Sequence, residues 1–199
     1  SDLLMAAYAS HGDTKHVLLI PSTPTECFEM MADAFDLAEQ LQTPVLFMTD
    51  LDLGMNEHMC PPFKWDDNRK YNRGKVLNAE ELEAASSWGR YRDVDGDGIP
   101  YRTLPGTHPT KGAYFTRGSS HDENAVYSED SDTYVRIMNR LAKKLETAKT
   151  LVPGPAFYQE NNESEIGVIF FGTSRYAAEE ALDIMRADGL KIDAMRLKA

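Results

Sequence analysis

The sequence predicts an α/β protein with a parallel sheet. Residues 16–20 (HVLLI) and 45–49 (VLFMT) are short segments that are apolar along nearly their whole length, and a helical pattern separates them. Strands of this kind are typical of a parallel sheet that is covered on both faces. Residues 166–197 repeat the order of strand, helix and strand. We therefore expect one βαβ unit followed by the start of a second.

The composition limits the classes of partner. The 199 residues carry a formal net charge of −11, which argues against nucleic acid or an anionic membrane, since both favour a basic surface. No apolar run is long enough to cross a bilayer. Cys27 and Cys60 are the only cysteines, and they form no Cys-x-x-Cys pair for zinc or an iron–sulfur cluster. We expect a soluble, cytoplasmic protein without nucleic-acid or membrane partners.

The helix between the first two strands has a clear start. Thr23 is a favourable N-cap, Pro24 suits the first helical position, and Glu26 completes a capping box. Parallel strands share their carboxyl edge, where ligands usually bind. Residues 21–23 and 50–54 are therefore expected at that edge of the sheet.

Two more helices are expected in the middle of the chain. Residues 80–87 are consistent with a short helix. Residues 131–150 form an amphipathic pattern with acids at the start and bases at the end, the order that complements a helix dipole. The apolar side chains on one side of this pattern are Val135, Met138, Leu141 and Leu145.

The last part of the chain predicts a second βαβ unit. Residues 152–164 have the composition of a linker. A strand at 166–171, a turn at 172–174, a helix that ends at Gly189 and a strand at 191–197 follow. Two strands and one helix do not bury a stable core by themselves, so we expect an incomplete second domain and a chain that is a fragment.

Residues 93–122 are the first candidate for a functional segment. Irregular stretches of this length are usually functional or disordered, and five apolar anchors argue against disorder: Ile99, Tyr101, Leu104, Tyr114 and Phe115. The segment also holds donors suited to an anionic ligand or a partner subunit, namely His108, Lys111, Arg117 and His121. Alternatively, the histidines hold the loop backbone and the other two side chains are solvated.

The start of this segment resembles half of a calcium loop. Asp93, Asp95 and Asp97 alternate along the chain and Gly98 follows, a pattern in which carboxylates surround Ca²⁺ or Mg²⁺. The acidic residue expected at the twelfth position is replaced by Leu104. The alternative is a turn whose carboxylates accept hydrogen bonds from nearby backbone amides.

Other motifs carry weaker signals. Asp50 follows a strand and suits either chemistry or a helix cap, and the turn at 172–174 resembles an anion site at a helix start. The sequence His11-Gly12-Asp13 suits an active-site turn or a helix end. Cys27 is expected to be a core residue. No Ser/His/Asp triad, P-loop or dinucleotide fingerprint is present.

Three stretches together resemble the α subunit of the 2-oxoacid:ferredoxin oxidoreductases. They are residues 1–54, residues 97–146 with the sequence DGIPYRTLPGTHPTKGAYFTRGSSHDE at their start, and residues 166–197 (IGVIFFGTSRYAAEEALDIMRADGLKIDAMRL). The resemblance covers almost the whole chain and is strongest to the 2-oxoglutarate branch.

The resemblance implies a division into domains. Residues 1–150 would be the latter part of the domain that holds the aminopyrimidine ring of thiamine diphosphate, with a long loop at 51–130. Residues 151–165 would be a linker, and residues 166–199 the start of a transketolase-C-terminal-like domain. The implied fold is an incomplete pyrimidine-type domain with a parallel sheet.

The resemblance also implies a reaction. The family converts 2-oxoglutarate or a related 2-oxoacid and coenzyme A to acyl-CoA and carbon dioxide, and passes electrons to ferredoxin. A β subunit, expected in an α2β2 assembly, supplies most contacts to thiamine diphosphate and Mg²⁺ and the iron–sulfur cluster. The activating glutamate and the substrate arginine are expected before Ser1. No catalytic residue is therefore assigned, and the fragment alone is expected to be inactive.

Two other functions fit the residues. One is a non-catalytic α/β interaction domain whose Asp93, Asp95 and Asp97 bind calcium and whose long loop recognises a protein. The other is the pyrimidine-binding subunit of a 2-oxoacid dehydrogenase that uses lipoamide in place of ferredoxin.

Overall fold

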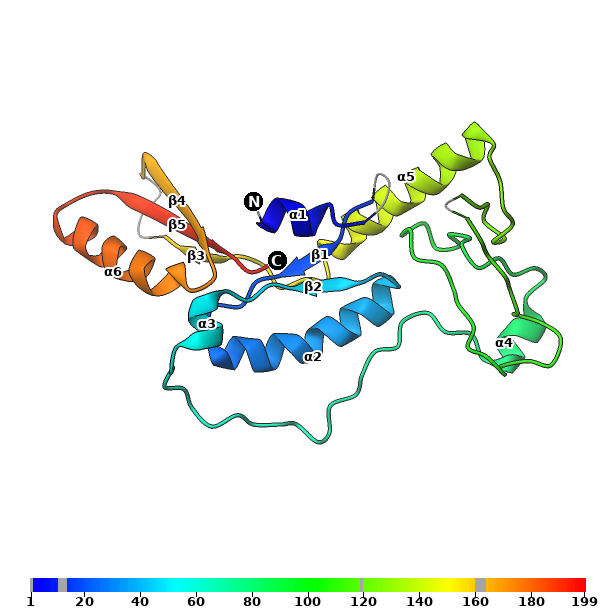
Figure 1. Cartoon of the computed structure of the whole chain (residues 1–199), viewed down its shortest axis with the longest axis horizontal. Helices are drawn as coiled ribbons and strands as arrows, with labels where there is room; N and C mark the ends of the chain where they lie inside the picture. The colour runs from blue at the N-terminus through cyan, green and yellow to red at the C-terminus, as the bar shows by residue number, and fades with distance from the viewer. Residues whose placement is uncertain (1, 11–13, 119, 160–163) are drawn as a thin grey trace. The chain divides into compact units, whose positions relative to one another are not determined.

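The computed structural model describes residues 2–10, 14–118, 120–159 and 164–199. Helices and strands alternate over much of the chain (Figure 1). Their order is α1 (Asp2–Ala7), β1 (Val17–Leu19), α2 (Pro24–Leu41), β2 (Val45–Phe47), α3 (Leu51–Met55), α4 (Ala79–Ala84), α5 (Ser131–Ala148), β3 (Ala156–Tyr158), β4 (Ile166–Phe171), α6 (Ser174–Ala187) and β5 (Ile192–Leu197).

Contacts divide the chain into two compact units. One, the α5 unit, comprises Ser1–His16, Asp36–Thr43 and Tyr71–Leu151. The other, the sheet unit, comprises Val17–Phe35, Pro44–Lys70 and Val152–Ala199. The domain boundaries expected at 150 and 165 stay a prediction.

The first βαβ prediction is confirmed in the sheet unit. Strands β1 and β2 pair in parallel, with Val17 opposite Val45, and Leu19 is fully buried. Each strand is shorter than the apolar segment that predicted it. Since the two strands are parallel, the residues that follow Leu19 and Phe47 leave from the same edge, as expected.

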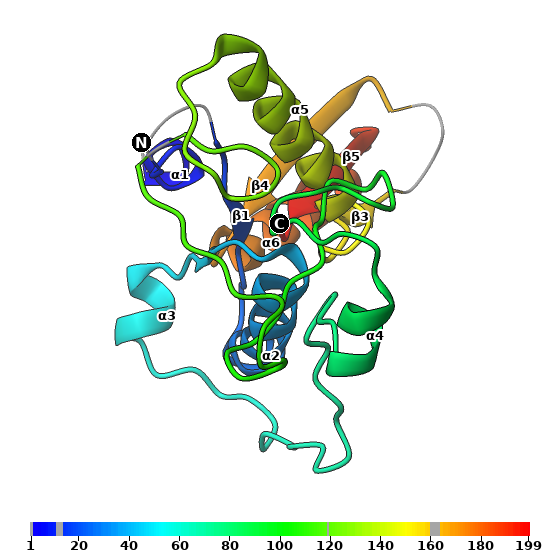
Figure 2. The same ribbon diagram turned by 90° about the vertical axis from the view of Figure 1, so that its right-hand side faces the viewer.

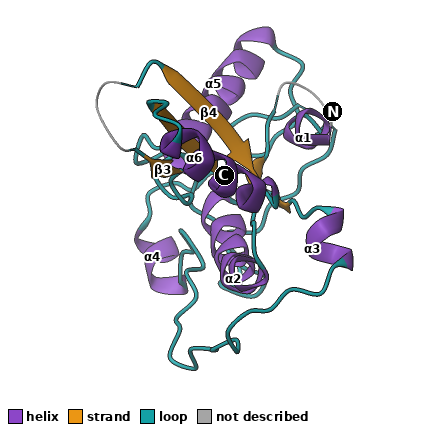
Figure 3. Ribbon diagram, turned by 90° about the vertical axis from the view of Figure 1, so that its left-hand side faces the viewer, coloured by secondary structure: helices purple, strands orange, loops and turns teal. Residues whose placement is uncertain are grey.

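The second sheet of this unit has the order β3-β5-β4. Strands β4 and β5 are parallel, and β3 is antiparallel to β5. Helix α6 packs on this sheet (Figure 3), and four residues form the buried cluster: Phe170, Leu182, Ile192 and Ala194. The expected linker at 152–164 therefore contains a strand, β3, which pairs with a partner far away in the sequence.

Helix α2 begins as the capping signals predicted, with one shift. The Glu26 amide donates to Thr23 Oγ1 (3.1 Å), but the Glu26 carboxylate accepts from the Ser22 amide (2.9 Å) and the Ser22 hydroxyl (2.8 Å) rather than from Thr23. Arg196 of β5 forms a two-fold ion pair with this carboxylate, at 2.6 and 2.8 Å, and also donates to the Ser22 hydroxyl. The helix start is thereby joined to the sheet.

Helix α5 is the longest helix that lies wholly within the α5 unit. The segment between α4 and α5 runs mostly as loops (Figure 2). Helix α4 begins with a capping box between Asn78 and Glu81. On α5 the buried residues are Thr133, Ile137, Lys144 and Ala148. Val135, which the sequence places on the apolar side of the helix, is 53% exposed. No helix in the described ranges is both long and apolar enough for a membrane span.

Candidate functional site

The acidic segment at 93–98 is fastened to the last turns of α5. Arg140 donates to the Gly98 carbonyl (3.0 Å), and Thr147 Oγ1 donates to the Asp97 carbonyl (2.7 Å). Gly98 has φ +80 and lies so close to the helix that a Cβ would be 2.3 Å from the Lys144 nitrogen. Only glycine fits there, because the conformation and the space both exclude a side chain.

The three aspartates of this segment are engaged within the protein. Asp93 accepts hydrogen bonds from the amides of Gly96 (2.9 Å) and Gly98 (3.0 Å). Lys75 Nζ lies 2.6 Å from the Asp95 carboxylate and 2.8 Å from the Asp97 carboxylate. Burial opposes the charge of Lys75, but the hydrogen bonds to both carboxylates raise the pKa of Lys75 above its ordinary value.

The calcium hypothesis stays a prediction. Within the described residues, no three His, Cys, Asp or Glu side chains are arranged to hold a metal ion. Lys75 instead supplies the positive charge between Asp95 and Asp97. A divalent cation would therefore have to displace an ammonium group that already has two carboxylate partners.

Removing Lys75 tests which cation these carboxylates accept. We expect Lys75→Met to increase the rise in melting temperature caused by millimolar Ca²⁺, because Asp95 and Asp97 lose their ammonium partner. Differential scanning fluorimetry with and without Ca²⁺ measures this. Lys143→Met, at an exposed position, is the control. If neither the wild-type protein nor the Lys75 variant responds to Ca²⁺, the acidic segment is a turn and not a metal site.

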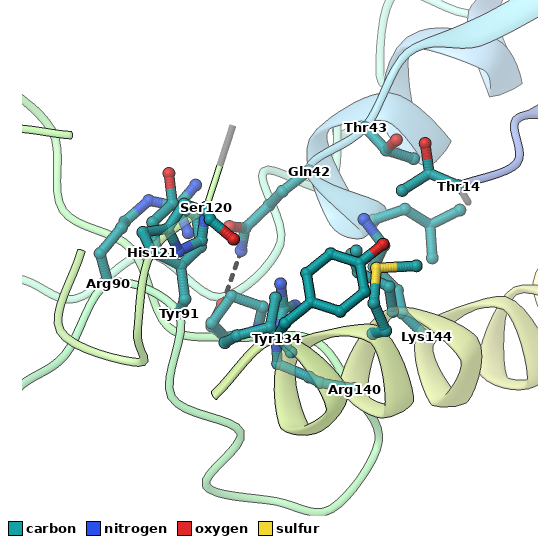
Figure 4. A pocket seen from close by; sticks show the side chains of 15 residues that line it. Thr14, Gln42, Thr43, Arg90, Tyr91, Ser120, His121, Tyr134, Arg140 and Lys144 are labelled. Atoms are coloured by element: carbon teal, nitrogen blue, oxygen red, sulfur yellow. Dashed lines mark hydrogen bonds between the residues drawn. The ribbon is translucent and has the colours of Figure 1, made fainter. Parts of the chain in front are cut away.

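A cavity of about 610 Å³ in the α5 unit lies between α5 and the loops. In Figure 4, Tyr134, Arg140 and Lys144 come from α5, and Arg90, Tyr91 and His121 come from loops. Gln42 lines the same cavity and donates to the Pro100 carbonyl (2.6 Å). The remaining lining is mostly apolar: Leu41, Ile137, Met138 and Leu141.

Three cations line this cavity, which we call the cationic pocket: Arg90, Arg140 and Lys144. Lys144 is only 9% exposed. Burial and then repulsion by Arg140 and Arg90 lower the pKa of Lys144 to about 8. The same two causes, burial first and the Arg90 charge second, lower the pKa of Arg140.

His121 is the one member of the predicted donor set that lines the cationic pocket among the described residues. Its ring stacks on Tyr91 with a centroid distance of 3.9 Å. The Arg90 guanidinium also lies over the Tyr91 ring, with its Cζ 4.9 Å from the ring centre. The cation–π contact orients Arg90 at the pocket wall.

The other predicted donors lie elsewhere in the α5 unit. His108 Nδ1 accepts from the amides of Thr110 (3.2 Å) and Lys111 (3.0 Å), while its Nε2 lies 3.0 Å from Glu83. Lys111 pairs with the same glutamate at 2.9 Å. Arg117 lies over the Tyr127 ring at 5.8 Å. These hydrogen bonds are the ones expected if His108 holds the loop backbone, and a role for this loop in ligand or subunit binding stays a prediction.

The weaker motifs are explained within the sheet unit. Asp50 caps α3 through the Leu53 amide (2.9 Å), and its second oxygen accepts from the amide (3.0 Å) and hydroxyl (2.7 Å) of Thr173. The carboxylate of Asp50 therefore fills the anion site expected at 172–174. Burial and the nearby charges of Glu26 and Asp50 raise the pKa of Cys27, which suits an unreactive thiol. The turn at 11–13 lies outside the described residues.

Sequence reasoning missed Arg90, Arg140 and Lys144. Lys144 is one of the bases at the helix end that complement the dipole, yet it is buried on the same helical face as Ile137 and Ala148. A lysine seven positions after one buried residue and four before another is the signal that predicts its burial. No comparable signal exists for Arg90, because it comes from a loop.

Comparisons with known proteins extend over nearly the whole chain. A scan against protein-family models finds no match. The chain is 26% identical over 193 residues to subunit alpha of 2-oxoacid:ferredoxin oxidoreductase 2 of Aeropyrum pernix, which covers 96% of this chain and 29% of that protein. It is 27% identical over 200 residues to the 2-oxoglutarate synthase subunit KorA of Methanothermobacter thermautotrophicus, covering 99% of this chain and 50% of that protein.

A solved structure shares the fold. The 2-oxoglutarate:ferredoxin oxidoreductase from Magnetococcus marinus, with 2-oxoglutarate, coenzyme A and succinyl-CoA bound, matches all of this chain and 33% of its own chain, with a TM-score of 0.83 and 22% identity. The chain spans half or less of the length of these relatives. Over nearly its whole length, the chain is similar in sequence to α subunits of 2-oxoacid:ferredoxin oxidoreductases and to a KorA subunit.

Proposed function

We propose that the chain is part of the α subunit of a thiamine-diphosphate-dependent 2-oxoacid:ferredoxin oxidoreductase. The complete enzyme would decarboxylate 2-oxoglutarate or a related 2-oxoacid oxidatively, form an acyl-CoA and pass electrons to ferredoxin. The observation that carries this proposal is the match to α subunits over 96–99% of the chain. The shared fold supports it, as does the parallel βαβ unit.

The cofactors of such an enzyme need a partner subunit. Iron–sulfur clusters are typically held by four cysteine thiolates, whereas this chain has only Cys27 and Cys60. Cys27 is partly buried and Cys60 is exposed. These residues do not fit a cluster, so we assign the cluster to a β subunit, together with most contacts to thiamine diphosphate and Mg²⁺. An α2β2 assembly would bring the subunits together.

The role of this chain is then to support the active site rather than to perform the chemistry. We propose that the loop carrying His108, Lys111, Arg117 and His121 contributes to the substrate cleft or to the subunit contact. Lys111 and Arg117 are exposed. Lys111 is held by its ion pair with Glu83, and Arg117 by its contact with the Tyr127 ring. By itself the chain is expected to be inactive.

Ferredoxin reduction by the complete α subunit, assembled with its β subunit, tests the proposal. We expect reduction that depends on both 2-oxoglutarate and coenzyme A, and none from the 199-residue chain alone. Pyruvate in place of 2-oxoglutarate tests the choice of 2-oxoacid. Lipoamide in place of ferredoxin tests the dehydrogenase alternative. An assembled complex that reduces no acceptor with any 2-oxoacid would contradict the proposal and favour a non-catalytic interaction domain.

The same assay tests the loop. Lys111→Ala and Arg117→Ala are expected to raise the KM for the 2-oxoacid or to weaken subunit assembly, measured by size-exclusion chromatography. Lys143→Ala, an exposed lysine on α5, is the matched control. Unchanged KM and unchanged assembly in both loop variants would remove the loop from the cleft and from the interface.

A further inference from the structure

We propose that the cationic pocket of the α5 unit binds a small organic phosphate. The pocket is lined by Arg90, Arg140 and Lys144 (Figure 4). This inference goes beyond the proposed function, because it concerns a binding site and not the oxidoreductase reaction. Ligand binding, and not oxidoreductase activity, therefore tests it.

The cationic pocket carries unbalanced positive charge. None of the three cations forms an ion pair with a described residue. Buried charges in proteins are normally paired or hydrogen-bonded, because leaving them alone is costly. Here two arginines and a lysine converge on one cavity in a chain whose net charge is −11. An anionic ligand would supply the missing partner.

Both arginines of the cationic pocket have unused hydrogen-bond donors. Arg90 Nε and Nη1 and Arg140 Nε are buried and have no hydrogen-bond partner. Nearby acids do not provide one: Asp93 accepts from two backbone amides, and Glu123 pairs with Arg136 at 3.0 Å. Buried donors without partners are rare in folded proteins. Donors of this kind at a cavity wall are suited to a ligand that brings acceptors.

The arrangement of the three cations favours a phosphate group over a carboxylate. Arg90 comes from a loop, whereas Arg140 and Lys144 lie one turn apart on α5, so the cations surround the cavity from more than one direction. A phosphate monoester carries close to two negative charges at pH 7 and presents three acceptor oxygens in different directions. A carboxylate offers one charge and two oxygens in a plane. The phosphate matches three cations better.

The size and lining of the cationic pocket suit an organic phosphate better than a free phosphate ion. Its volume of about 610 Å³ is in the range of small-molecule sites and far exceeds the volume of a free phosphate ion. Apart from the cations, the lining is mostly apolar and includes Leu41, Ile137, Met138 and Leu141. This apolar wall fits the organic part of a phosphorylated molecule.

Isothermal titration calorimetry on the full-length protein, in its complex, tests the inference. The probes are phenyl phosphate, inorganic phosphate and benzoate at matched ionic strength. We expect phenyl phosphate to bind more tightly than inorganic phosphate, since it adds apolar contact, and more tightly than benzoate. Lys144→Met should weaken phenyl phosphate binding about tenfold or more, as expected for the loss of a charged hydrogen bond.

Lys143→Met is the matched control, because Lys143 is exposed and adjacent to Lys144 on α5. It should bind phenyl phosphate as the wild-type protein does. Without ligand, Lys144→Met should melt no lower than the wild-type protein, because it removes a buried charge that Arg140 and Arg90 repel. Equal binding by both lysine variants, or tighter binding of benzoate, would overturn the inference. So would the absence of any binding.

Discussion

Replacing Arg196 by alanine is expected to lower the free energy of unfolding by about 3–5 kcal/mol, the usual cost of removing one partner of a buried ion pair. Arg196 is only 4% exposed, and both of its terminal nitrogens contact the Glu26 carboxylate. The variant leaves Glu26 with only Ser22 as a partner. Urea denaturation at pH 7 measures the loss.

The pH dependence of stability provides a second measurement of the same pair. Burial raises the pKa of Glu26, but the hydrogen bond from Arg196, with those from Ser22, lowers it to about 2. The folded-state pKa is therefore below that of the unfolded chain. The stabilisation is fully present above pH 4.5 and is lost as the pH falls toward 2, by about 3 kcal/mol in the wild-type protein. Arg196→Ala should flatten this part of the profile.

Arg175→Ala is the control for this prediction. Arg175 pairs with Glu179 at 2.8 Å on α6, but both side chains are about one third exposed. Pairs of this kind contribute at most about 1 kcal/mol. If Arg196→Ala costs no more than Arg175→Ala, the Glu26–Arg196 pair does not join α2 to the sheet in the way its geometry indicates.

Replacing Gly98 by alanine should be nearly as damaging. A Cβ at this position would lie 2.3 Å from the Lys144 nitrogen, 2.7 Å from the Arg140 oxygen and 2.8 Å from the Lys144 Cα. These are backbone atoms of a helix, so the loop would have to move away from α5. Overpacking of about 1–3 kcal/mol combines with about 1–2 kcal/mol for a left-handed backbone. The expected loss is about 2–5 kcal/mol.

Gly96→Ala separates the two contributions. Gly96 has φ +75, close to that of Gly98, but its added Cβ would meet nothing within 4 Å. It should therefore cost only the backbone part, about 1–2 kcal/mol. Thermal unfolding of both variants measures the difference. Similar losses for the two variants would show that the contact between Gly98 and α5 is not tight in solution.

The sequence predicted the elements whose signals are local. The strand at 166–171 was predicted with the bounds of β4, and the end of α6 followed from Gly189. The start of α2 followed from Thr23 and Pro24. In each case a capping side chain, a glycine conformation or an apolar run specifies the structure without distant partners.

Features that depend on distant contacts were missed. Strand β3 exists through its pairing with β5, and its three residues follow a Pro-Gly-Pro stretch that looks like a linker. Among the five apolar anchors proposed for the long loop, only Ile99 is buried, whereas Phe115 is 81% exposed. The cationic pocket needs Arg90 to meet α5, a contact that no local pattern encodes. The hydrophobic periodicity of a helix or strand predicts which of its faces is apolar. It does not predict which distant residues pack against that face.

Asp50 has a consequence for ligand access at the β4–α6 turn. Its carboxylate is tethered beside the Thr173 amide and hydroxyl at 3.0 and 2.7 Å. A dissolved anion would have to compete with an intramolecular group whose effective concentration is on the order of millimolar or higher. The Asp50 carboxylate thus occupies the anion-binding position of this turn. Phosphates or carboxylates that bind weakly would not displace it at ordinary cellular concentrations.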